Sequence, residues 1–379
     1  MKFSFITTMG RLPWAGSEEL WSLAAMSLAA RGEIVNAWLP AWRGQSVQQL
    51  KLQEQGVSVK SYGFRNQRIG RIALSILPRI SNKFCHLPYL APARSKLGDL
   101  VLVSQGAVMD GSGWLSHLLN EKVNYAVLCQ ANSECQWPND EEVTILRKNF
   151  LKAKMVYFVS HENERLFRIQ TGYTGTNTRV IWNPIQPGTP NQILPWPEYN
   201  DGKLRLAVVG RMEPFAKGQD LVLEIMSRNE WINRNVEVTF YGKGPWQNTA
   251  ERIIRDRKLI NVKVGGYTAP VNIWEKNHAL LMPSRHEGKA LAMLESMWLG
   301  RPVVATAIGG ASEEVIDGIT GFLCAAPSLD LFAETMERMW ESRDKLQFLG
   351  RNAAKRLRTR MPNHPGEEFA EELIRLNAE

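Results

Sequence analysis

Short apolar runs alternate with longer amphipathic stretches along this chain, and the alternation predicts a parallel β/α architecture. The first run, Phe3–Thr7, is followed by a stretch with helical spacing from Glu18 to Ala30 and then by a second run, Ile34–Leu39. Runs this short, separated by helical stretches, indicate strands that are buried on both faces of a parallel sheet. Further candidate strands are 100–104, 125–129, 155–160, 206–209, 236–241, 262–265 and 279–282.

A proline-rich segment interrupts this series. Pro187–Pro197 contains four prolines, and a new β/α series begins at Leu204. We therefore expect a linker here between two Rossmann-like domains. Ser312–Ile316 and Gly318–Phe322 are expected to close the second sheet. The expected divisions are 1–190, 198–361 and a final helical segment, 362–379.

One βαβ unit of the second series holds the densest candidate chemistry. The run 279–282 delivers Glu287 to a loop end, and a helix is predicted from Gly288, with Glu295 eight residues after Glu287. Eight residues correspond to about 12 Å of helical rise. The first amides of this helix, those of Gly288, Lys289, Ala290 and Leu291, would favour a phosphate. The bland alternative is that one carboxylate caps the helix and the other is solvated.

A second candidate loop follows the predicted strand 206–209. It reads Gly-Arg-Met-Glu-Pro-Phe-Ala-Lys-Gly from Gly210 to Gly218 and precedes a helix predicted over Gln219–Met226. An Arg and a Lys on a loop are usually solvated. Between a strand and a helix, however, Arg211 as a planar fork and Lys217 as a point charge suit a phosphorylated ligand.

Composition narrows the class of protein. The chain has 379 residues, of which 44% are hydrophobic and 22% charged, as is typical of a soluble two-domain protein. No apolar run reaches the length of a membrane span, and the segment before Arg11 is too short for a secretory signal. The four cysteines show no C-x-x-C spacing, so we expect a reducing cytoplasm without zinc or disulfides. The dinucleotide fingerprint G-x-G-x-x-G does not follow the first strand, which disfavours a dehydrogenase.

The net charge of +8 is unevenly distributed. Between Gln55 and Gly98 there are eight basic residues and no acidic one, with apolar residues among them. This segment is either a solvated basic surface or a docking site for an anionic membrane. Nucleic acid is disfavoured because no nucleic-acid motif accompanies it. The basic residues are Lys60, Arg65, Arg68, Arg71, Arg79, Lys83, Arg94 and Lys96.

The chain resembles the retaining group-1 (family 4) glycosyltransferases of GT-B fold. The resemblance lies in Ser-x-x-Glu-Gly at 284–288, Glu-Ser-Met at 295–297, Gly-x-Pro-Val-Val at 300–304 and Gly-Gly at 309–310. Gly-Arg-x5-Lys-Gly at 210–218 resembles a second motif of the family. The chain departs from the family at Ala290, where a Gly is usual. The resemblance implies two Rossmann-like domains that face each other across a cleft, with the C-terminal helix crossing back onto the first.

The resemblance also implies roles for individual residues. Arg211 and Lys217 would contact the donor diphosphate, Glu295 the ribose, and Glu287 the donor sugar. Gly210, Tyr267 and the turn from Gly288 to Leu291 would complete the donor site. In the first domain, which would hold the acceptor, Ala15-Gly16-Ser17-Glu18 resembles a Gly-Gly-x-Glu loop. There, Gln130 stands near the strand end where many members of the family have a His.

The function implied is transfer of a hexose from a nucleotide-diphosphate sugar, with UDP-glucose the first expectation. The acceptor would be a glycan or lipid-linked molecule of envelope polysaccharide assembly, met at the cytoplasmic face of a membrane to which the protein binds peripherally. We expect neither a metal nor another cofactor, because no Asp-x-Asp motif is present. The alternatives are a nucleotide-sugar epimerase or hydrolase of the same fold, and a catalytically silent protein that binds a membrane surface.

Overall fold

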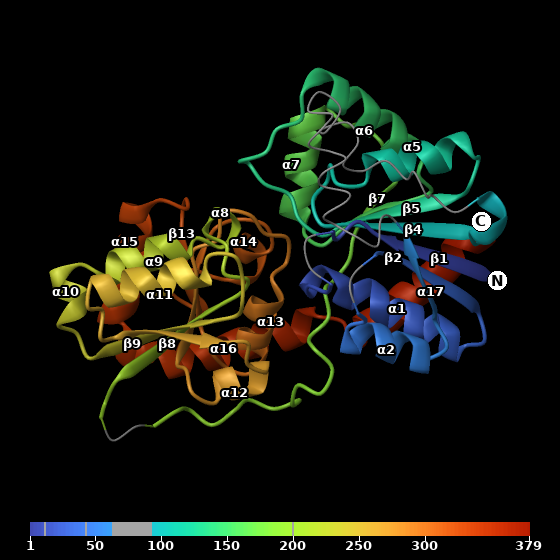
Figure 1. Cartoon of the computed structure of the whole chain (residues 1–379). Coiled ribbons are helices and arrows are strands. Elements are labelled where there is room, and N and C mark those ends of the chain that lie inside the picture. The colour runs from blue at the N-terminus through green and yellow to red at the C-terminus, as the bar shows by residue number, and fades with distance from the viewer. Residues whose placement is uncertain (11–12, 42–43, 63–92, 199–200) are drawn as a thin grey trace. The chain divides into compact units, whose positions relative to one another are not determined.

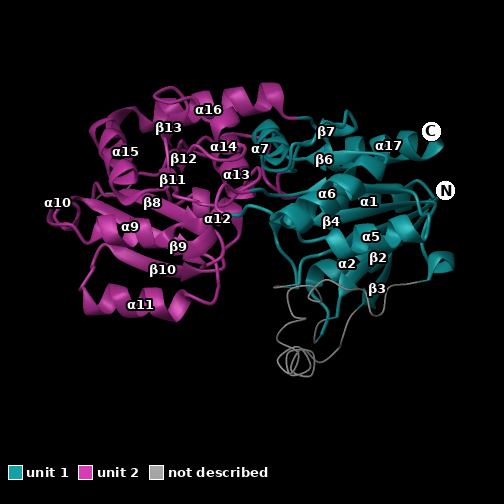
Figure 2. Cartoon of the chain, turned by 90° about the horizontal axis from the view of Figure 1, so that it is seen from above, with its two compact units in different colours: residues 1–132, 136–184, 362–379 teal, residues 133–135, 185–361 magenta. Residues whose placement is uncertain are grey.

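The computed structural model of the chain describes residues 1–10, 13–41, 44–62, 93–198 and 201–379. These residues form two compact units (Figure 2). Unit 1 comprises residues 1–132, 136–184 and 362–379, and unit 2 comprises residues 133–135 and 185–361.

Unit 1 is a seven-stranded sheet in the order β3-β2-β1-β4-β5-β6-β7, and every pairing is parallel. The strands are β1 Lys2–Thr7, β2 Ile34–Pro40, β3 Ser58–Tyr62, β4 Leu100–Gln105, β5 Tyr125–Cys129, β6 Val156–Phe158 and β7 Thr178–Val180. The helices and short 3-10 turns are η1 Gly16–Glu18, α1 Glu19–Ala30, α2 Val47–Glu54, η2 Arg94–Lys96, α5 Ser112–Asn120, α6 Asp140–Lys152, α7 His161–Thr171 and α17 Pro365–Ala378.

The two faces of this sheet are covered by different helices, as its buried strands require. Phe3 and Phe5 of β1 pack in one core with α1 and α17, whereas Ile6 packs in a second core with residues of α5 and α6. This alternation follows from the two-residue period of a strand. Continuous apolar strands are therefore the sequence signature of a sheet covered on both faces.

The last helix, α17, packs on unit 1 although it follows all of unit 2 in the chain. It lies beside α1 (Figure 1), and its Phe369 stacks edge to face on Tyr157 with ring centroids 5.0 Å apart. Its Glu372 accepts a hydrogen bond from the Tyr157 hydroxyl and forms an ion pair with Arg179. The expectation that the C-terminal helix returns to the first domain is confirmed.

Unit 2 is a six-stranded parallel sheet in the order β10-β9-β8-β11-β12-β13. Its strands are β8 Leu204–Val209, β9 Val236–Tyr241, β10 Val262–Gly266, β11 Ala279–Met282, β12 Val303–Thr306 and β13 Gly321–Cys324. Its helices and one 3-10 turn are α8 Pro214–Lys217, α9 Gln219–Met226, α10 Asn229–Ile232, α11 Gln247–Asp256, α12 Pro270–Trp274, α13 Leu291–Trp298, α14 Ala311–Glu314, α15 Leu329–Glu341, η3 Arg343–Lys345 and α16 Leu346–Arg360.

Two expectations for unit 2 are corrected. The helix predicted from Gly288 begins at Leu291, with Ala290 at its N-cap. The strand predicted over Ser312–Ile316 is wrong, because α14 occupies Ala311–Glu314 and the last strand begins only at Gly321. Ser312, Glu313 and Glu314 follow one another without an apolar residue, so the segment lacks the pattern of a buried strand.

Residues 185–197, which we call the linker segment, belong to unit 2 and are bonded to it. The Leu194 amide donates to the Leu299 carbonyl over 3.2 Å, and the Trp298 indole donates to the Pro190 carbonyl over 3.1 Å. The guanidinium of Arg301, a fully buried side chain, donates to the carbonyls of Leu194 and Pro195. The linker segment is thereby fixed against the C-terminal end of α13.

Most of the basic segment predicted in the first domain lies outside the described residues, including Arg65, Arg68, Arg71, Arg79 and Lys83 with the apolar residues between them. Of its described members, Lys60 donates to Asn36 over 2.7 Å. Within the ranges given above, the structure contains no helix that is both long and apolar enough to cross a membrane.

Candidate active site

In unit 2 the candidate residues lie at the point where the order of the strands in the sheet reverses. Strands β8 and β11 are adjacent, with Leu206 paired to Ala279, but β9 and β10 continue on one side and β12 and β13 on the other. At such a switch point the loops after two neighbouring strands separate and leave room for a ligand. The loop 210–218 follows β8, and the loop 283–290 follows β11.

A glycine allows these two loops to touch backbone to backbone. Gly218 has φ +65°, and a Cβ built on it would lie 1.9 Å from the carbonyl oxygen of Pro283. The amides of Arg285 and His286 both donate to the Ala216 carbonyl, over 2.8 and 3.1 Å. Only a residue without a side chain fits this approach, since its conformation is left-handed and its neighbour is backbone.

An ion pair adds a second connection between the same segments. The Arg285 guanidinium donates to both carboxylate oxygens of Asp220, over 2.7 and 2.8 Å, and to the Pro214 carbonyl over 2.8 Å. The hydrogen bonds that Arg285 donates to Asp220 raise the pKa of Arg285 above its usual value. This pair could not be predicted from the sequence, because an Arg and an Asp 65 residues apart give no local signal.

Lys217 and Glu287, predicted from separate motifs, are in direct contact. The Lys217 ammonium lies 2.6 Å from Oε1 of Glu287, and the Ser284 hydroxyl donates to the same oxygen over 2.8 Å. The Lys217 side chain is 27% exposed and that of Glu287 is 8% exposed. An anionic ligand can therefore reach the cation, while the carboxylate is held in one orientation.

Gly210 and Arg211 lie beside this pair. A Cβ on Gly210 would come within 3.5 Å of the Lys217 side chain, so the two residues are packed together. Arg211 forms an ion pair with Glu213, and its carbonyl accepts a hydrogen bond of 2.7 Å from Gln219. The half-buried Arg211 guanidinium is thus positioned by its own loop.

The turn that opens α13 is the third part of the site. The Gly288 carbonyl accepts a hydrogen bond of 2.6 Å from the Gly310 amide, and Ala290 caps α13 without a side-chain bond. The first amides of the helix, beginning with Leu291, have no acceptor within the helix, which makes this end a place for an anion. The Lys289 ammonium points away from solvent and bonds to Glu314 over 3.0 Å.

The two remaining candidates for the donor site, Glu295 and Tyr267, differ in their distance from the switch point and in their exposure. Glu295 is buried on α13, in the helix that the turn opens. Tyr267 follows β10, which β9 separates from β8, and its side chain is 71% exposed. The structure joins Lys217 to Glu287, next to the turn 288–291, and packs Gly210 against Lys217. Arg211 lies on the same loop as Lys217, and Tyr267 lies two strands away from β8.

In unit 1 the candidate loop residues follow β1 and β5. Ala15 precedes η1 and accepts a hydrogen bond of 3.0 Å from the Glu18 amide, and Gly16 is the first residue of η1. Gln130 directly follows β5 and is 5% exposed. Its amide nitrogen finds no acceptor within the part of the chain that the structure describes, so it can donate to a ligand hydroxyl.

Glu18, the last residue of the Ala15–Glu18 motif, is a buried carboxyl group for which the sequence predicted no individual role. The Trp21 indole donates to one of its oxygens and the Ser17 hydroxyl to the other, each over 3.1 Å. Burial raises the pKa of Glu18 to about 7. The available signal was an acid after a Gly at a strand–helix turn, followed by a Trp three residues later.

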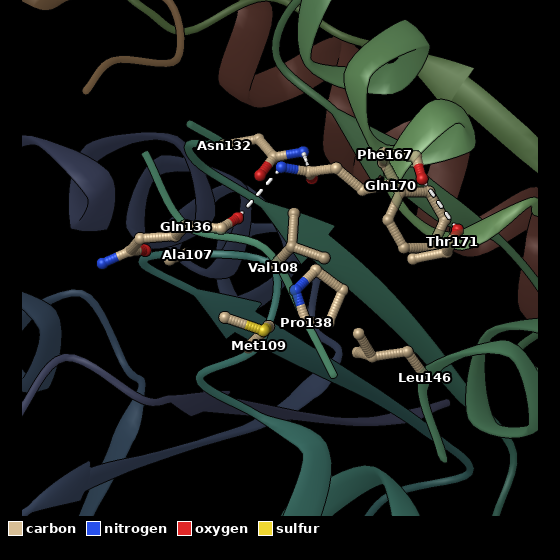
Figure 3. A pocket seen from close by; sticks show the side chains of 10 residues that line it. All are labelled: Ala107, Val108, Met109, Asn132, Gln136, Pro138, Leu146, Phe167, Gln170 and Thr171. Carbon is tan, nitrogen blue, oxygen red and sulfur yellow. Dashed lines mark hydrogen bonds between the residues drawn. The ribbon is translucent and has the colours of Figure 1, made fainter. Parts of the chain in front are cut away.

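A small pocket lies beyond β4 and β5 in unit 1 (Figure 3). Asn132 donates to Gln170 over 2.9 Å, and Gln170 donates to the Gln136 carbonyl over the same distance. Most of the lining is apolar, from Ala107, Val108, Met109, Pro138, Leu146 and Phe167. The pocket and Gln130 both follow the carboxyl ends of strands, where ligands bind in open α/β sheets.

Part of the chain matches a known protein family. Residues 195–356 match the family model of glycosyl transferases group 1. The trehalose synthase of Thermococcus litoralis is 33% identical over 104 residues, which are 27% of this chain and 25% of that protein. The matched stretch thus spans only about a quarter of that curated relative.

Two solved structures share the fold over almost their whole length. HepE of Anabaena, crystallised with UDP-glucose, has a TM-score of 0.72 at 16% identity, covering 99% of both chains. Sucrose-phosphate synthase from Thermosynechococcus elongatus has a TM-score of 0.71 at 16% identity, covering 99% of this chain and 98% of its own. Residues 195–356 therefore match a glycosyl transferases group 1 domain, and the chain as a whole has the GT-B fold.

Proposed function

We propose that the protein is a retaining, metal-independent hexosyltransferase that uses a nucleotide-diphosphate sugar. The observation that carries this proposal is the contact of Lys217 with Glu287 at the switch point of unit 2, beside the turn 288–291. A cation and the amides at the start of a helix suit the diphosphate of such a donor, and a carboxylate suits its sugar hydroxyls.

Each residue has a role in this proposal. Arg211, Lys217 and the amides of residues 288–291 hold the diphosphate, and Glu295 accepts hydrogen bonds from the ribose hydroxyls. Glu287 contacts donor-sugar hydroxyls and stabilises positive charge at the anomeric carbon. Positively charged donors aimed at a leaving diphosphate supply the stabilisation that a metal gives in other enzymes.

In the proposed transfer, the acceptor hydroxyl attacks the anomeric carbon from the face that the diphosphate leaves. The bond from that carbon to the phosphate oxygen breaks, and a bond to the acceptor oxygen forms. The departing phosphate oxygen takes the acceptor's proton, so no side-chain base is needed. This scheme is compatible with Gln130, because an amide can donate to a sugar hydroxyl but cannot act as a base.

UDP-glucose is the donor we propose first, supported by the HepE structure, which was solved with that ligand. For the acceptor we propose a glycan or lipid-linked molecule of envelope polysaccharide assembly at the cytoplasmic face of a membrane. The buried side-chain amide of Gln130, directly after β5, supports a polar group on the acceptor.

The experiment is product analysis in excess chelator. The protein is incubated with UDP-glucose, UDP-galactose, UDP-N-acetylglucosamine and GDP-mannose, each with and without a pool of glycan and lipid-linked acceptors. We expect a new α-linked glycoside only when an acceptor is present. Donor epimerisation or hydrolysis without acceptor, or a complete and metal-reversible loss of transfer, would contradict the proposal.

A further inference from the structure

A buried lysine lies directly behind the turn 288–291. The Lys289 side chain is 2% exposed, and its ammonium lies 3.0 Å from Oε1 of Glu314 and 3.5 Å from Oε2 of Glu313. Glu314, the last residue of α14, is completely buried. A cation in the middle of the candidate phosphate turn is therefore directed into the unit and not toward a ligand.

The same carboxylate connects the turn to α16. Arg360 lies 3.1 Å from the second oxygen of Glu314, and the Arg356 guanidinium donates to the carbonyls of Glu313 and Glu314 over 2.7 and 3.0 Å. Both arginines are on α16, which also packs against α13. The position of the turn is thus tied to two helices through one side chain.

The backbone of the turn is held from the same side. In addition to the Gly310–Gly288 hydrogen bond, Gly309 has φ +48°, and a Cβ on it would lie 2.3 Å from the Gly288 carbonyl oxygen. With this carbonyl pinned to the loop after β12, the direction of the following amides depends on how the Lys289 side chain is anchored. The side chain and the carbonyl fix the turn at two points.

Lys289 could in principle bind the diphosphate itself or only hold the turn. To reach a ligand, its ammonium would have to leave Glu314 and strip a fully buried carboxylate of one of its cations, which is strongly unfavourable. We propose that Lys289 is a positioning residue: its ion pair with Glu314 holds residues 288–291 with their amides toward the donor diphosphate. The inference rests on the function proposed above, because that function supplies the diphosphate.

This role can be separated from a contribution to stability. A buried ion pair replaced by apolar residues of similar volume often leaves a protein as stable as before, or more stable, whereas removal of one partner is destabilising. The double variant Lys289→Met/Glu314→Leu should therefore unfold within a few degrees of the wild type while losing the fixed turn.

The test is calorimetric titration of the full chain with UDP, GDP and ADP. For the nucleotide that the wild type prefers, we expect binding at least 10-fold weaker in Lys289→Met/Glu314→Leu. The matched control is Arg234→Met/Glu337→Leu, which removes another ion pair of unit 2, joined over 2.6 and 2.7 Å, far along the chain from the turn. This control should bind like the wild type.

A single substitution decides between the two roles by the sign of its effect. Glu314→Gln keeps the shape of the side chain and weakens its hold on Lys289. If Lys289 positions the turn, nucleotide binding weakens several-fold. If the ammonium itself binds phosphate, its release tightens binding, and the inference is overturned.

The outcomes also separate this inference from the proposed function. Wild-type affinity in both Lys289→Met/Glu314→Leu and Glu314→Gln overturns the inference and leaves the function standing. Should the double variant fail to fold, the Glu314→Gln result decides alone. A wild type that binds none of the three nucleotides removes the proposed function, and the inference falls with it.

Discussion

The side chain of Lys217 connects two sequence motifs through an ion pair. Its ammonium bonds to Glu287, a residue 70 positions later in the chain, and the partial exposure of Lys217 leaves it accessible to an anion. In the proposed mechanism, Lys217 and Arg211 stabilise the negative charge that develops on the leaving diphosphate. The contribution of such a group appears in turnover more than in substrate affinity.

We expect Lys217→Ala and Arg211→Ala each to lower turnover by about 10²-fold or more, since removal of one donor to developing charge costs about 3 kcal/mol. Steady-state rates at saturating donor measure the effect, and thermal unfolding checks the fold. Arg228→Ala is the control, because Arg228 pairs with the exposed Asp330 in the same unit. Near-normal turnover in either variant would remove that residue from the mechanism.

Glu18 makes a second prediction at this scale. Burial raises the pKa of this carboxyl from 4.5 in the unfolded chain to about 7. A raised carboxyl pKa means that the neutral form stabilises the fold. This stabilisation is complete below about pH 4.5 and is lost as the pH rises through about 7.

Glu18→Gln removes the titration and keeps an oxygen for the Trp21 indole. Between pH 5.5 and 8.5 the wild type should lose roughly 2 kcal/mol of unfolding free energy relative to Glu18→Gln. Urea unfolding of both proteins across this range measures the difference, and the comparison cancels the titration of Glu19 and other groups. A difference that does not change with pH would show that Glu18 is ionised throughout.

Single residues were predicted where a local motif carried them, and missed where a distant contact defined them. Lys217 and Glu287 stand in recognisable spacings, and the structure joins their side chains, although their roles stay predictions. Asp220 and Glu314 act through partners many residues away. No local pattern contains such information, because burial and pairing are set by the tertiary fold.

At the scale of elements, the strands were predicted more accurately than the turns. The ranges 125–129, 236–241 and 279–282 agree with β5, β9 and β11. β5 and β11 are continuous apolar runs, as expected of strands buried on both faces, whereas β9 alternates between buried and partly exposed residues. The boundary of α13 was misplaced by three residues, since Gly288 and Lys289 form a turn whose bonds lead to Gly310 and Glu314. The strand expected at 312–316 failed because that segment has few apolar residues.

The contact between the two loops depends on Gly218. In Gly218→Ala, the new Cβ would overlap the Pro283 carbonyl in a left-handed conformation, and we expect a loss of at least about 3 kcal/mol in unfolding free energy. Gly266→Ala is a matched control: its φ of +64° is nearly the same, but nothing lies within 4 Å of the added atom.

The control should lose only about 1 kcal/mol, the cost of the left-handed conformation. Urea unfolding midpoints measure both variants, and nucleotide titration reports on the site. Equal losses in the two variants would mean that the approach of Gly218 to Pro283 contributes nothing.

For the whole molecule, the two sheets and the returning C-terminal helix could be predicted from the alternation of apolar runs, the proline-rich break and the family resemblance. The way in which the protein binds a membrane or an acceptor could not be predicted, because the basic segment carries no motif. We propose that it docks on an anionic membrane, with each surface cation contributing about 1 kcal/mol.

Vesicle co-sedimentation tests this docking. The protein should bind vesicles that contain phosphatidylglycerol, less so as salt is raised, and less in the variant Arg65→Glu/Arg68→Glu/Arg71→Glu. Vesicles of phosphatidylcholine alone serve as the control. If the protein ignores anionic vesicles at low salt, a freely diffusing sugar becomes the better candidate for the acceptor.

The linker segment limits where this chain can be joined to a relative in a chimera. Two of its carbonyls accept hydrogen bonds from the buried guanidinium of Arg301. Its Ile193 packs so closely on Gly300 that a Cβ built on this glycine would lie 2.5 Å from the Ile193 side chain. In a chimera joined at residue 198, the buried Arg301 would therefore lose two of its acceptors, the carbonyls of Leu194 and Pro195, to a foreign peptide. A junction between Pro184 and Ile185 keeps these contacts. The proline-rich stretch must therefore come from the same parent protein as the rest of unit 2.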